Sequence, residues 1–364
     1  MARFEDVFSD ETKRGRKIQA SEYLSVGKYP VIDQGQAQIA GYTDLEDGLF
    51  TDVPAIVFGD HTRIIKYIDR PFFLGADGVK VLKTKVDDTD YKYLFYCLQN
   101  TKIPNTGYNR HFKWLKEVEI PLPPLEEQRR IATLLDKVSD LIVKRRAQLD
   151  KLDLLVKARF VEMFGDPLID SGRYPKVPLG SLEEVGSSKR IFEKEYVSEG
   201  VPFYRTKEIV ELSKGNRITS ELFITRHRYD EIRKEYGVPK AGDLLISAVG
   251  TIGVIWIVDG KNDFYFKDGN LLRVATNGKF APIYLKHLLE ALIGAYKLEM
   301  SSGTAYAALT ISALKEMLVY EVPIQEQEQF ASFVKHTDKS KLTIQQSLDK
   351  LETLKKALMQ QYFM

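Results

Sequence analysis

The chain has 364 residues, and its 53 lysines and arginines nearly balance its 51 aspartates and glutamates. This length allows two or three domains, and the small net charge excludes a strongly basic tail or surface that would by itself indicate a polyanionic partner. The single cysteine, Cys97, excludes an intramolecular disulfide and a thiolate metal cluster, and it suits a reducing cytosol. No apolar run reaches the length of a membrane span and the N-terminal residues lack the apolar part of a secretion signal, so we expect a cytoplasmic protein.

Residues 1–120 predict a mixed α/β domain. Strand-like segments "KYPVID", "PAIVFGDHTRIIKYID" and "ADGVKVLKT" come first, and the helix-like segment "DYKYLFYCLQN" and the glycine loop "PNTGYNRH" follow. The alternation in "PAIVFGDHTRIIKYID" predicts a strand pair with polar residues at its tip. Cys97 lies on the apolar face of the expected helix, which favours packing over a reactive thiol.

Residues 121–165 predict one long helix. The phrase "IPLPPLEEQRRIATLLD", which begins at Ile120, opens with proline and an acidic first turn, and no internal Gly or Pro follows in the helix. A helix of roughly 40 residues would be about 60 Å long. Its apolar residues recur at alternating spacings of three and four, as in a coiled coil, at Leu135, Val138, Ile142, Leu149, Leu152, Val156 and Met163.

Residues 166–320 and 321–364 repeat this organisation. The phrase "YEVPIQEQEQFASFVKH" begins at Tyr320, and an offset of about 200 residues, which places Pro124 on Pro323, holds without a gap to the end of the chain. The segments before the two long helices are also similar, although more weakly. "GVPFYR" resembles "KYPVID", and "DLLISAVGTIGVIWIVD" resembles "PAIVFGDHTRIIKYID". The chain is therefore an internal duplication of a mixed α/β domain followed by a long helix.

This order predicts an arrangement of the helices. If the first helix leads from one domain to the other, a second helix that returns along the first buries both apolar seams. We therefore expect an antiparallel coiled coil and an approximate twofold relation between the halves, with the C-terminus back at the N-terminal domain.

Catalytic and metal-binding signals are weak. The glycines of "AVGTIGVIWIV" fit a strand hairpin better than a phosphate-binding loop, because no Lys-Ser or Lys-Thr follows. The five histidines show no paired metal spacing, and no nucleophile elbow or amino-methyltransferase motif occurs. The sequence therefore nominates no catalytic and no metal residue.

Binding signals are clearer, because cations, amides and aromatic residues gather in loops at corresponding places of the two halves. Such mixtures suit phosphate contacts, base edges and stacking. Solvated turns and core-packed aromatic residues are the alternatives, and "RYDEIRK" also fits a helix with internal ion pairs. The candidate DNA-binding residues are Lys13, Arg14, Arg16, Lys17, His61, Arg63, Lys66, Asn105, Thr106, Tyr108, Asn109, Arg110, His111, Lys113, Lys189, Arg190, Arg205, Lys207, Arg226, His227, Arg228, Ser301, Ser302, Thr304 and Tyr306.

These phrases resemble a known family. "IPLPPLEEQRRIATLLDKV", followed by a long helix that ends in "ARFVEMFGDP", resembles the central conserved region of the specificity subunit of Type I restriction-modification systems. "VFGDHTRIIKY" and "GDLLISAVGTIGV" resemble the target recognition domains of that family. The resemblance spans essentially the whole chain, although the second copy of the phrase, from Val322 to Gln327, lacks two prolines and the arginine pair.

The resemblance implies a non-catalytic DNA reader. Residues 1–120 and 166–320 would be target recognition domains, each for one half of a bipartite target, and residues 121–165 and 321–364 would be spacer helices. Two methyltransferase subunits, with S-adenosylmethionine, would methylate adenine, and ATP-dependent restriction subunits would complete the complex, so this chain would bind no cofactor itself. The helix length limits the separation of the half-sites to under about 18 base pairs.

Two other functions stay open from the residues alone. One is a stand-alone DNA-acting enzyme, such as a nuclease, with a coiled-coil stalk, and the other is a two-headed coiled-coil adaptor for proteins. Cleavage by the purified chain would favour the first, and absence of sequence-dependent duplex binding would favour the second.

Overall fold

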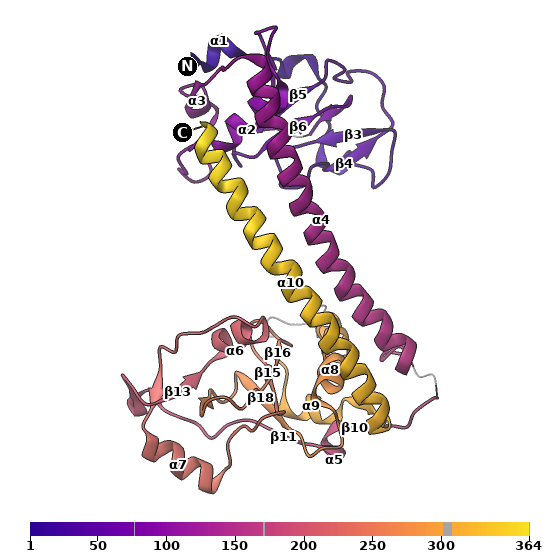
Figure 1. Ribbon diagram of the computed structural model, residues 1–364. Helices are drawn as coiled ribbons and strands as arrows, with labels where there is room; N and C mark the ends of the chain where they lie inside the picture. Colours follow the sequence, from indigo (N-terminus) through magenta and orange to yellow (C-terminus); the bar gives the residue numbers. More distant parts are fainter. Residues whose placement is uncertain (76, 170–171, 301–307, 364) are drawn as a thin grey trace. The chain divides into compact units, whose positions relative to one another are not determined.

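A computed structural model describes the chain except residues 76, 170–171, 301–307 and 364, and it divides the chain into two units (Figure 1). The first unit comprises residues 1–148 and 344–364, and the second comprises residues 149–343. Each unit contains a mixed α/β domain and one part of each of two long helices, α4 (Leu125–Phe164) and α10 (Ile324–Phe363). The predicted fold class, two mixed domains alternating with two long helices that pack together, is confirmed.

The first domain contains two small sheets. The four-stranded antiparallel sheet has the order β2-β8-β5-β6, and the three-stranded sheet has the order β4-β3-β7 with β3 and β7 parallel. A strand pair, β1 and β9, joins the two ends of the domain. The elements are β1 (Ala2–Arg3), α1 (Phe4–Val7), β2 (Phe8–Asp10), β3 (Tyr29–Ile32), β4 (Gly41–Thr43), β5 (Ala55–Gly59), β6 (Ile65–Ile68), β7 (Phe73–Leu74), β8 (Val79–Thr84), α2 (Tyr91–Asn100), α3 (Phe112–Leu115) and β9 (Glu119–Ile120).

The second domain repeats this topology with one additional strand, β12, in the sheet that corresponds to β4-β3-β7. Its sheets have the orders β11-β18-β15-β16 and β12-β14-β13-β17, again with one parallel pair, β13 and β17, and a terminal pair, β10 and β19. The internal duplication is therefore confirmed at the level of topology. The elements are β10 (Lys176–Pro178), α5 (Leu179–Leu182), β11 (Glu184–Gly186), β12 (Tyr196–Val197), β13 (Val201–Tyr204), α6 (Thr206–Ser213), β14 (Phe223–Ile224), α7 (Arg226–Glu235), β15 (Leu244–Ser247), β16 (Ile255–Ile257), β17 (Tyr265–Phe266), β18 (Leu271–Ala275), α8 (Pro282–Met300), α9 (Ile311–Glu316) and β19 (Leu318–Tyr320).

The main core of the first unit surrounds α2. Its buried side chains meet the inner residues of β5 and β8 and the first turns of α4 in one apolar cluster. Cys97 is 4% exposed within this cluster, which confirms its packing role, and burial raises the pKa of its thiol to about 12. The corresponding cluster of the second unit surrounds α8 and includes the last turns of α4 and the first turns of α10.

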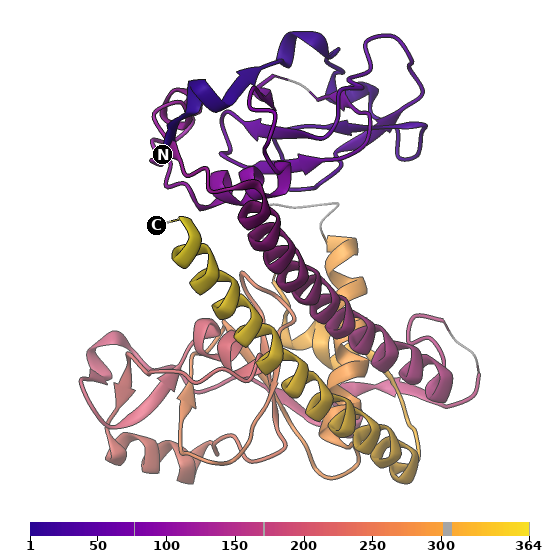
Figure 2. The same cartoon turned by 45° about the horizontal axis from the view of Figure 1, so that its top comes forward.

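The two long helices pair antiparallel in each unit. In the first unit the start of α4 lies beside the end of α10 (Figure 2). There the Arg130 guanidinium lies 5.5 Å from the Tyr362 ring centre. In the second unit the end of α4 meets the start of α10 through the rings of Phe160 and Phe330, with centres 5.3 Å apart. The predicted seam of the first long helix is confirmed by the buried side chains of Leu135, Val138, Ile142 and Val156, and Val334 and Leu348 of α10 are buried as well.

The C-terminus returns to the first domain, as the helix pairing predicts. Phe363, in the last turn of α10, packs against the Tyr93 ring of α2 at 5.3 Å between ring centres. None of the helices in the described part of the chain combines the length and the apolar character that a membrane crossing requires.

The repeated phrase that opens each long helix contains a buried glutamine. Gln128 is 2% exposed, accepts a hydrogen bond from the backbone N–H of Asp90 (3.0 Å) and donates one to the carbonyl of Pro123 (2.8 Å). Gln327 is fully buried, accepts from the N–H of Ala281 (2.8 Å) and donates to the carbonyl five residues before it (2.8 Å). Asp90 caps α2 and Ala281 immediately precedes α8. The same amide therefore ties the start of α4 to the start of α2, and the start of α10 to the start of α8.

Replacing Gln327 with leucine should destabilise the second unit. The substitution leaves buried backbone donors and acceptors without partners, at about 1–3 kcal/mol for each group. Urea unfolding monitored by circular dichroism measures the loss. Gln329→Leu, at an exposed position of α10 in the same unit, is the matched control and should change the free energy of unfolding by less than about 0.5 kcal/mol. Equal effects of the two substitutions would show that the buried amide does not hold the helix start.

Candidate nucleic-acid interface

Asp60 joins loops of the first domain at the tip of the β5–β6 hairpin. Its N–H donates to the Gly78 carbonyl (2.6 Å), and its own carbonyl accepts from the N–H of His111 (2.8 Å). Its carboxylate accepts from the N–H of Phe112 (2.7 Å), the first residue of α3, and the residue is 4% exposed. The hairpin tip, the turn before β8 and the loop before α3 are thus held as one body.

Gln34 adds the loop after β3 to this junction. Its side-chain oxygen accepts from the N–H of His61 (3.1 Å), and its amide nitrogen donates to the Asp77 carbonyl (3.1 Å). The Thr62 hydroxyl donates to the backbone carbonyl of Gln34 (2.6 Å). Four loops of the first domain therefore converge at one place, as a binding surface built on a rigid scaffold requires.

An aromatic pair projects from this junction. Tyr108 is 86% exposed, and its ring stacks on His61 with centres 4.6 Å apart and planes 6° apart. Asn105, Asn109 and Arg110 of the same loop are also exposed. A supported aromatic ring beside exposed amides and a cation can stack on a base and donate to base edges. The structure therefore brings the predicted residues 105–110 together with His61.

Arg63 occupies a strained position at the same tip. Its φ of 62° is a left-handed conformation that a non-glycine residue adopts at a cost of about 1–3 kcal/mol. Its guanidinium reaches the Ile103 carbonyl at 3.4 Å, in the loop that carries Tyr108. Such strain concentrates at functional sites, which agrees with the predicted place of Arg63 on a binding surface.

The second domain builds the same junction from Ala248. Its N–H donates to the Asn270 carbonyl (2.8 Å), and its carbonyl accepts from the N–H of Leu309 (2.9 Å). These bonds match those of Asp60, because Ala248 holds the same place after β15 that Asp60 holds after β5. The other predicted residues of this region, Ser301, Ser302, Thr304 and Tyr306, lie outside the described residues.

The predicted cations near the start of the chain are exposed. Lys13 makes no hydrogen bond or ion pair within the described residues, while Lys17 pairs with Asp77 at 2.8 Å and so lowers the pKa of that carboxyl. Exposed pairs of this kind contribute at most about 1 kcal/mol, so a phosphate can displace the carboxylate. The remaining cations of this region form the pairs Arg14–Asp52 (2.8 Å) and Arg16–Asp47 (3.8 Å), and the Lys113 ammonium lies 4.2 Å from the Trp114 ring centre.

Two predicted DNA-binding residues are corrected by their burial. Lys66 is 3% exposed, donates to the Ala37 carbonyl (2.6 Å) and pairs with Asp33 (3.3 Å), and burial lowers the pKa of its ammonium. The alternation of β6 turns Lys66 inward together with Ile68. His111 is also fully buried, with Nδ1 3.0 Å from the carbonyl of Asp60. Both residues support the fold of the domain from inside.

The predicted cations of the second domain are mostly held by carboxylates. Arg205 and Lys207 both contact Glu221 at 2.8 Å, and these hydrogen bonds, that of Lys207 first, lower the pKa of this carboxyl to about 2. The internal ion pairs weighed as the alternative for "RYDEIRK" are present in α7, where Arg228 pairs with Glu231 at 3.2 Å. The other contacts are Arg190–Asp268 (2.7 Å), Arg226–Asp263 (2.6 Å), Arg228–Glu195 (2.9 Å), His227–Glu231 (3.6 Å) and the Lys189 ammonium at 4.9 Å from the Tyr236 ring centre.

Some functional positions escaped the sequence analysis. Gln34 organises the junction, but no sequence motif surrounds it in its polar loop. Gln128 aligns with Gln327 in the repeat, but the repeat does not reveal that both amides are buried and hydrogen-bonded. No cluster of metal-ligating side chains occurs in the part of the chain that the structure describes.

A protein-family model matches most of the chain. Residues 1–151 and 173–355 match the family described as Type I restriction modification DNA specificity domain. The chain belongs to this family. Members of this specificity family recognise DNA and leave catalysis to other subunits, so the predicted family, function and non-catalytic character are confirmed, and neither the nuclease nor the adaptor alternative gains support.

Individual members of the specificity family resemble this chain along most of its length. The putative type I restriction enzyme specificity subunit S.HindORF215P of Haemophilus influenzae is 27% identical over 293 residues, which cover 78% of this chain and 69% of that protein. The putative MjaX specificity subunit of Methanocaldococcus jannaschii is 23% identical over 396 residues, which cover 96% and 87%. The crystal structure of the S subunit from M. genitalium matches the fold with a TM-score of 0.59 at 18% identity, and covers 98% of this chain and 94% of that one.

Asp60→Ala should loosen the recognition loop of the first domain. It removes a charged acceptor of the Phe112 N–H, which is worth about 1.5–3 kcal/mol, whereas Asp60→Asn keeps an acceptor at the same place. Hydrogen exchange read by mass spectrometry should accelerate in residues 103–112 of the alanine variant and change little in the asparagine variant. Unchanged exchange in the alanine variant would show that the backbone bonds suffice.

Proposed function

We propose that this chain reads a bipartite duplex DNA target, with one half-site for each domain, and positions methyltransferase subunits on it. The observation that carries the proposal is the loop junction formed twice, at Asp60 and at Ala248, with the same backbone hydrogen bonds. Equivalent scaffolds with different side chains are suited to equivalent tasks on different sequences.

In the first domain, base contacts come from the loop that carries Tyr108. Its hydrogen bonds to Asp60 and its stacking on His61 order the loop before DNA binds, which reduces the entropy lost on association. Lys13, Lys17 and Arg110 contact phosphates and set the register, since exposed cations give affinity without sequence information.

Partner subunits supply the chemistry in this proposal. Two methyltransferase subunits that use S-adenosylmethionine methylate adenine, and ATP-dependent restriction subunits join the complex. Exposed apolar side chains on the long helices, at Val143 (64%), Leu154 (63%) and Leu342 (61%), are available for packing against such subunits. This chain itself binds neither cofactor.

Lys13→Gln should weaken binding to all duplex sequences alike. The loss of one phosphate contact should flatten the dependence of log affinity on log salt by about one unit. Fluorescence anisotropy with target and non-target duplexes, measured on the chain assembled with its methyltransferase, gives both slopes. Arg226→Gln is the matched control, because Asp263 already holds that guanidinium at 2.6 Å, and it should change the slope much less. A larger effect of Arg226→Gln would move the phosphate contacts to α7.

The combined substitutions Tyr108→Ala and Asn109→Ala should relax one half of the target. Loss of stacking costs about 1–3 kcal/mol for each base. Genome-wide methylation mapping in the host should show degeneracy at positions of one half-site, with the other half-site unchanged. An unaltered methylated motif would contradict base reading by this loop, and DNA cleavage by the purified chain alone would contradict the proposed function itself.

A further inference from the structure

The two domains differ at one equivalent position of their sheets. Val57, three residues before the junction residue Asp60, pairs with Lys66 across the β5–β6 hairpin. Leu245, three residues before Ala248, pairs with Trp256 across the β15–β16 hairpin. In the first domain the buried ammonium of Lys66 pairs with the partly exposed Asp33 at 3.3 Å. In the second domain Trp256 instead lines a cavity of about 580 Å³.

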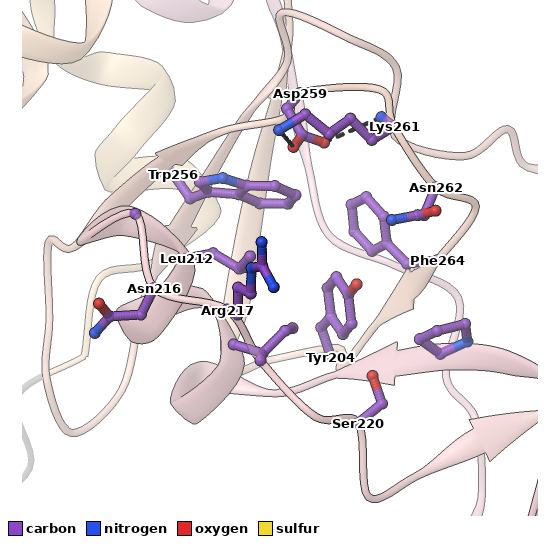
Figure 3. A pocket seen from close by; sticks show the side chains of 13 residues that line it. Tyr204, Leu212, Asn216, Arg217, Ser220, Trp256, Asp259, Lys261, Asn262 and Phe264 are labelled. Carbon is purple, nitrogen blue, oxygen red and sulfur yellow. Dashed lines mark hydrogen bonds and ion pairs between the residues drawn. The ribbon is translucent and has the colours of Figure 1, made fainter. Parts of the chain in front are cut away.

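The inner wall of this cavity is aromatic. Figure 3 shows Tyr204, Trp256 and Phe264 around it, from β13, β16 and the segment before β17. The rings of Tyr204 and Phe264 stack at 4.6 Å, and those of Trp256 and Phe264 lie 5.4 Å apart. All three side chains belong to the packed core of the domain, so the wall is rigid before any ligand enters.

One cation in the cavity lacks a counter-ion. Arg217 extends from the loop after α6 into the cavity, between Trp256 and Tyr204 (Figure 3), and makes no hydrogen bond or ion pair within the described residues. The other charges of the lining, Asp259 and Lys261, neutralise each other at 3.1 Å. The cavity therefore combines flat aromatic walls with one net positive charge.

These features select among ligands. The unpaired Arg217 disfavours a cationic ligand, because the carboxylate of Asp259 is already engaged. The polar side chains of Asn216, Ser220 and Asn262 in the lining disfavour an aliphatic chain. A planar heterocycle that carries an anionic group matches both the walls and the charge, and the volume lies in the range of roughly 300–1,000 Å³ that is typical of small-molecule sites.

We propose that this cavity binds one purine or pyrimidine nucleotide, with its base against Trp256 and Phe264 and its phosphate on Arg217. The nucleotide comes either from DNA, as an unpaired nucleotide outside the helix, or from the free pool. The site goes beyond the proposed function, because the loop junction that carries that function does not include the cavity.

Trp256 provides the signal that tests the proposal. The chain has two tryptophans, so a Trp114→Phe background leaves Trp256 as the sole reporter. Titration of the full chain with dAMP, dGMP, dCMP and dTMP should quench its fluorescence saturably, whereas deoxyribose 5-phosphate, which lacks a base, should not. Arg217→Gln should weaken this binding at least about tenfold, as the loss of a hydrogen-bonded charge pair predicts. Arg233→Gln, an exposed arginine in α7, is the matched control and should change nothing.

A second arm identifies the source of the nucleotide. Two non-target duplexes are compared, one fully paired and one with a single-nucleotide bulge. Stronger quenching by the bulged duplex, lost in Arg217→Gln, supports the proposal with DNA as the source, and quenching by free nucleotides alone supports it with the free pool. No saturable quenching by any of these probes, or equal binding by Arg217→Gln, overturns it. The methylated target motif of the assembled complex should be unchanged by Arg217→Gln, so failure here is separable from failure of DNA recognition.

Discussion

A buried glutamine amide at the start of each long helix is the constraint on which both units depend. Gln128 and Gln327 each satisfy a donor and an acceptor that would otherwise be buried without partners. A buried polar group is costly unless it is bonded, so each amide specifies one position of the long helix against α2 or α8. The orientation of each long helix on its domain follows from this contact, as does the apolar packing around it.

Backbone hydrogen bonds also hold the loop junction of each domain together. Asp60 and Ala248 have different side chains but share their two backbone hydrogen bonds, so these two bonds do not require a particular side chain. In the first domain the Asp60 carboxylate adds a further bond, to the N–H of Phe112. Side chains in the attached loops are thereby free to differ between the domains. This separation of scaffold from reading residues gives a physical reason for using one fold twice on two different half-sites.

The two domains have similar topology but differ in whether their exposed cations form ion pairs. The first domain presents Lys13 and Arg110 without ion pairs among the described residues, whereas the second engages Arg205, Lys207 and Arg226 with carboxylates. The insertion that contains α6 and α7 accounts for most of these pairs and also forms the outer wall of the aromatic cavity. The second domain therefore combines the shared junction with features of its own.

The sequence by itself determined the duplication, the long helices with their seams, and the hairpins, because these follow from repetition and from apolar periodicity along the chain. The tertiary structure decided which polar residues face solvent. Lys66 stands in a cationic phrase, yet strand alternation and Asp33 hold it inside, and Gln128 is buried because α2 starts beside it. The cavity at Trp256 depends on two strands, β13 and β16, and on two loops that are distant in sequence. Burial and hydrogen-bond partners arise from contacts between remote segments, which local patterns do not encode.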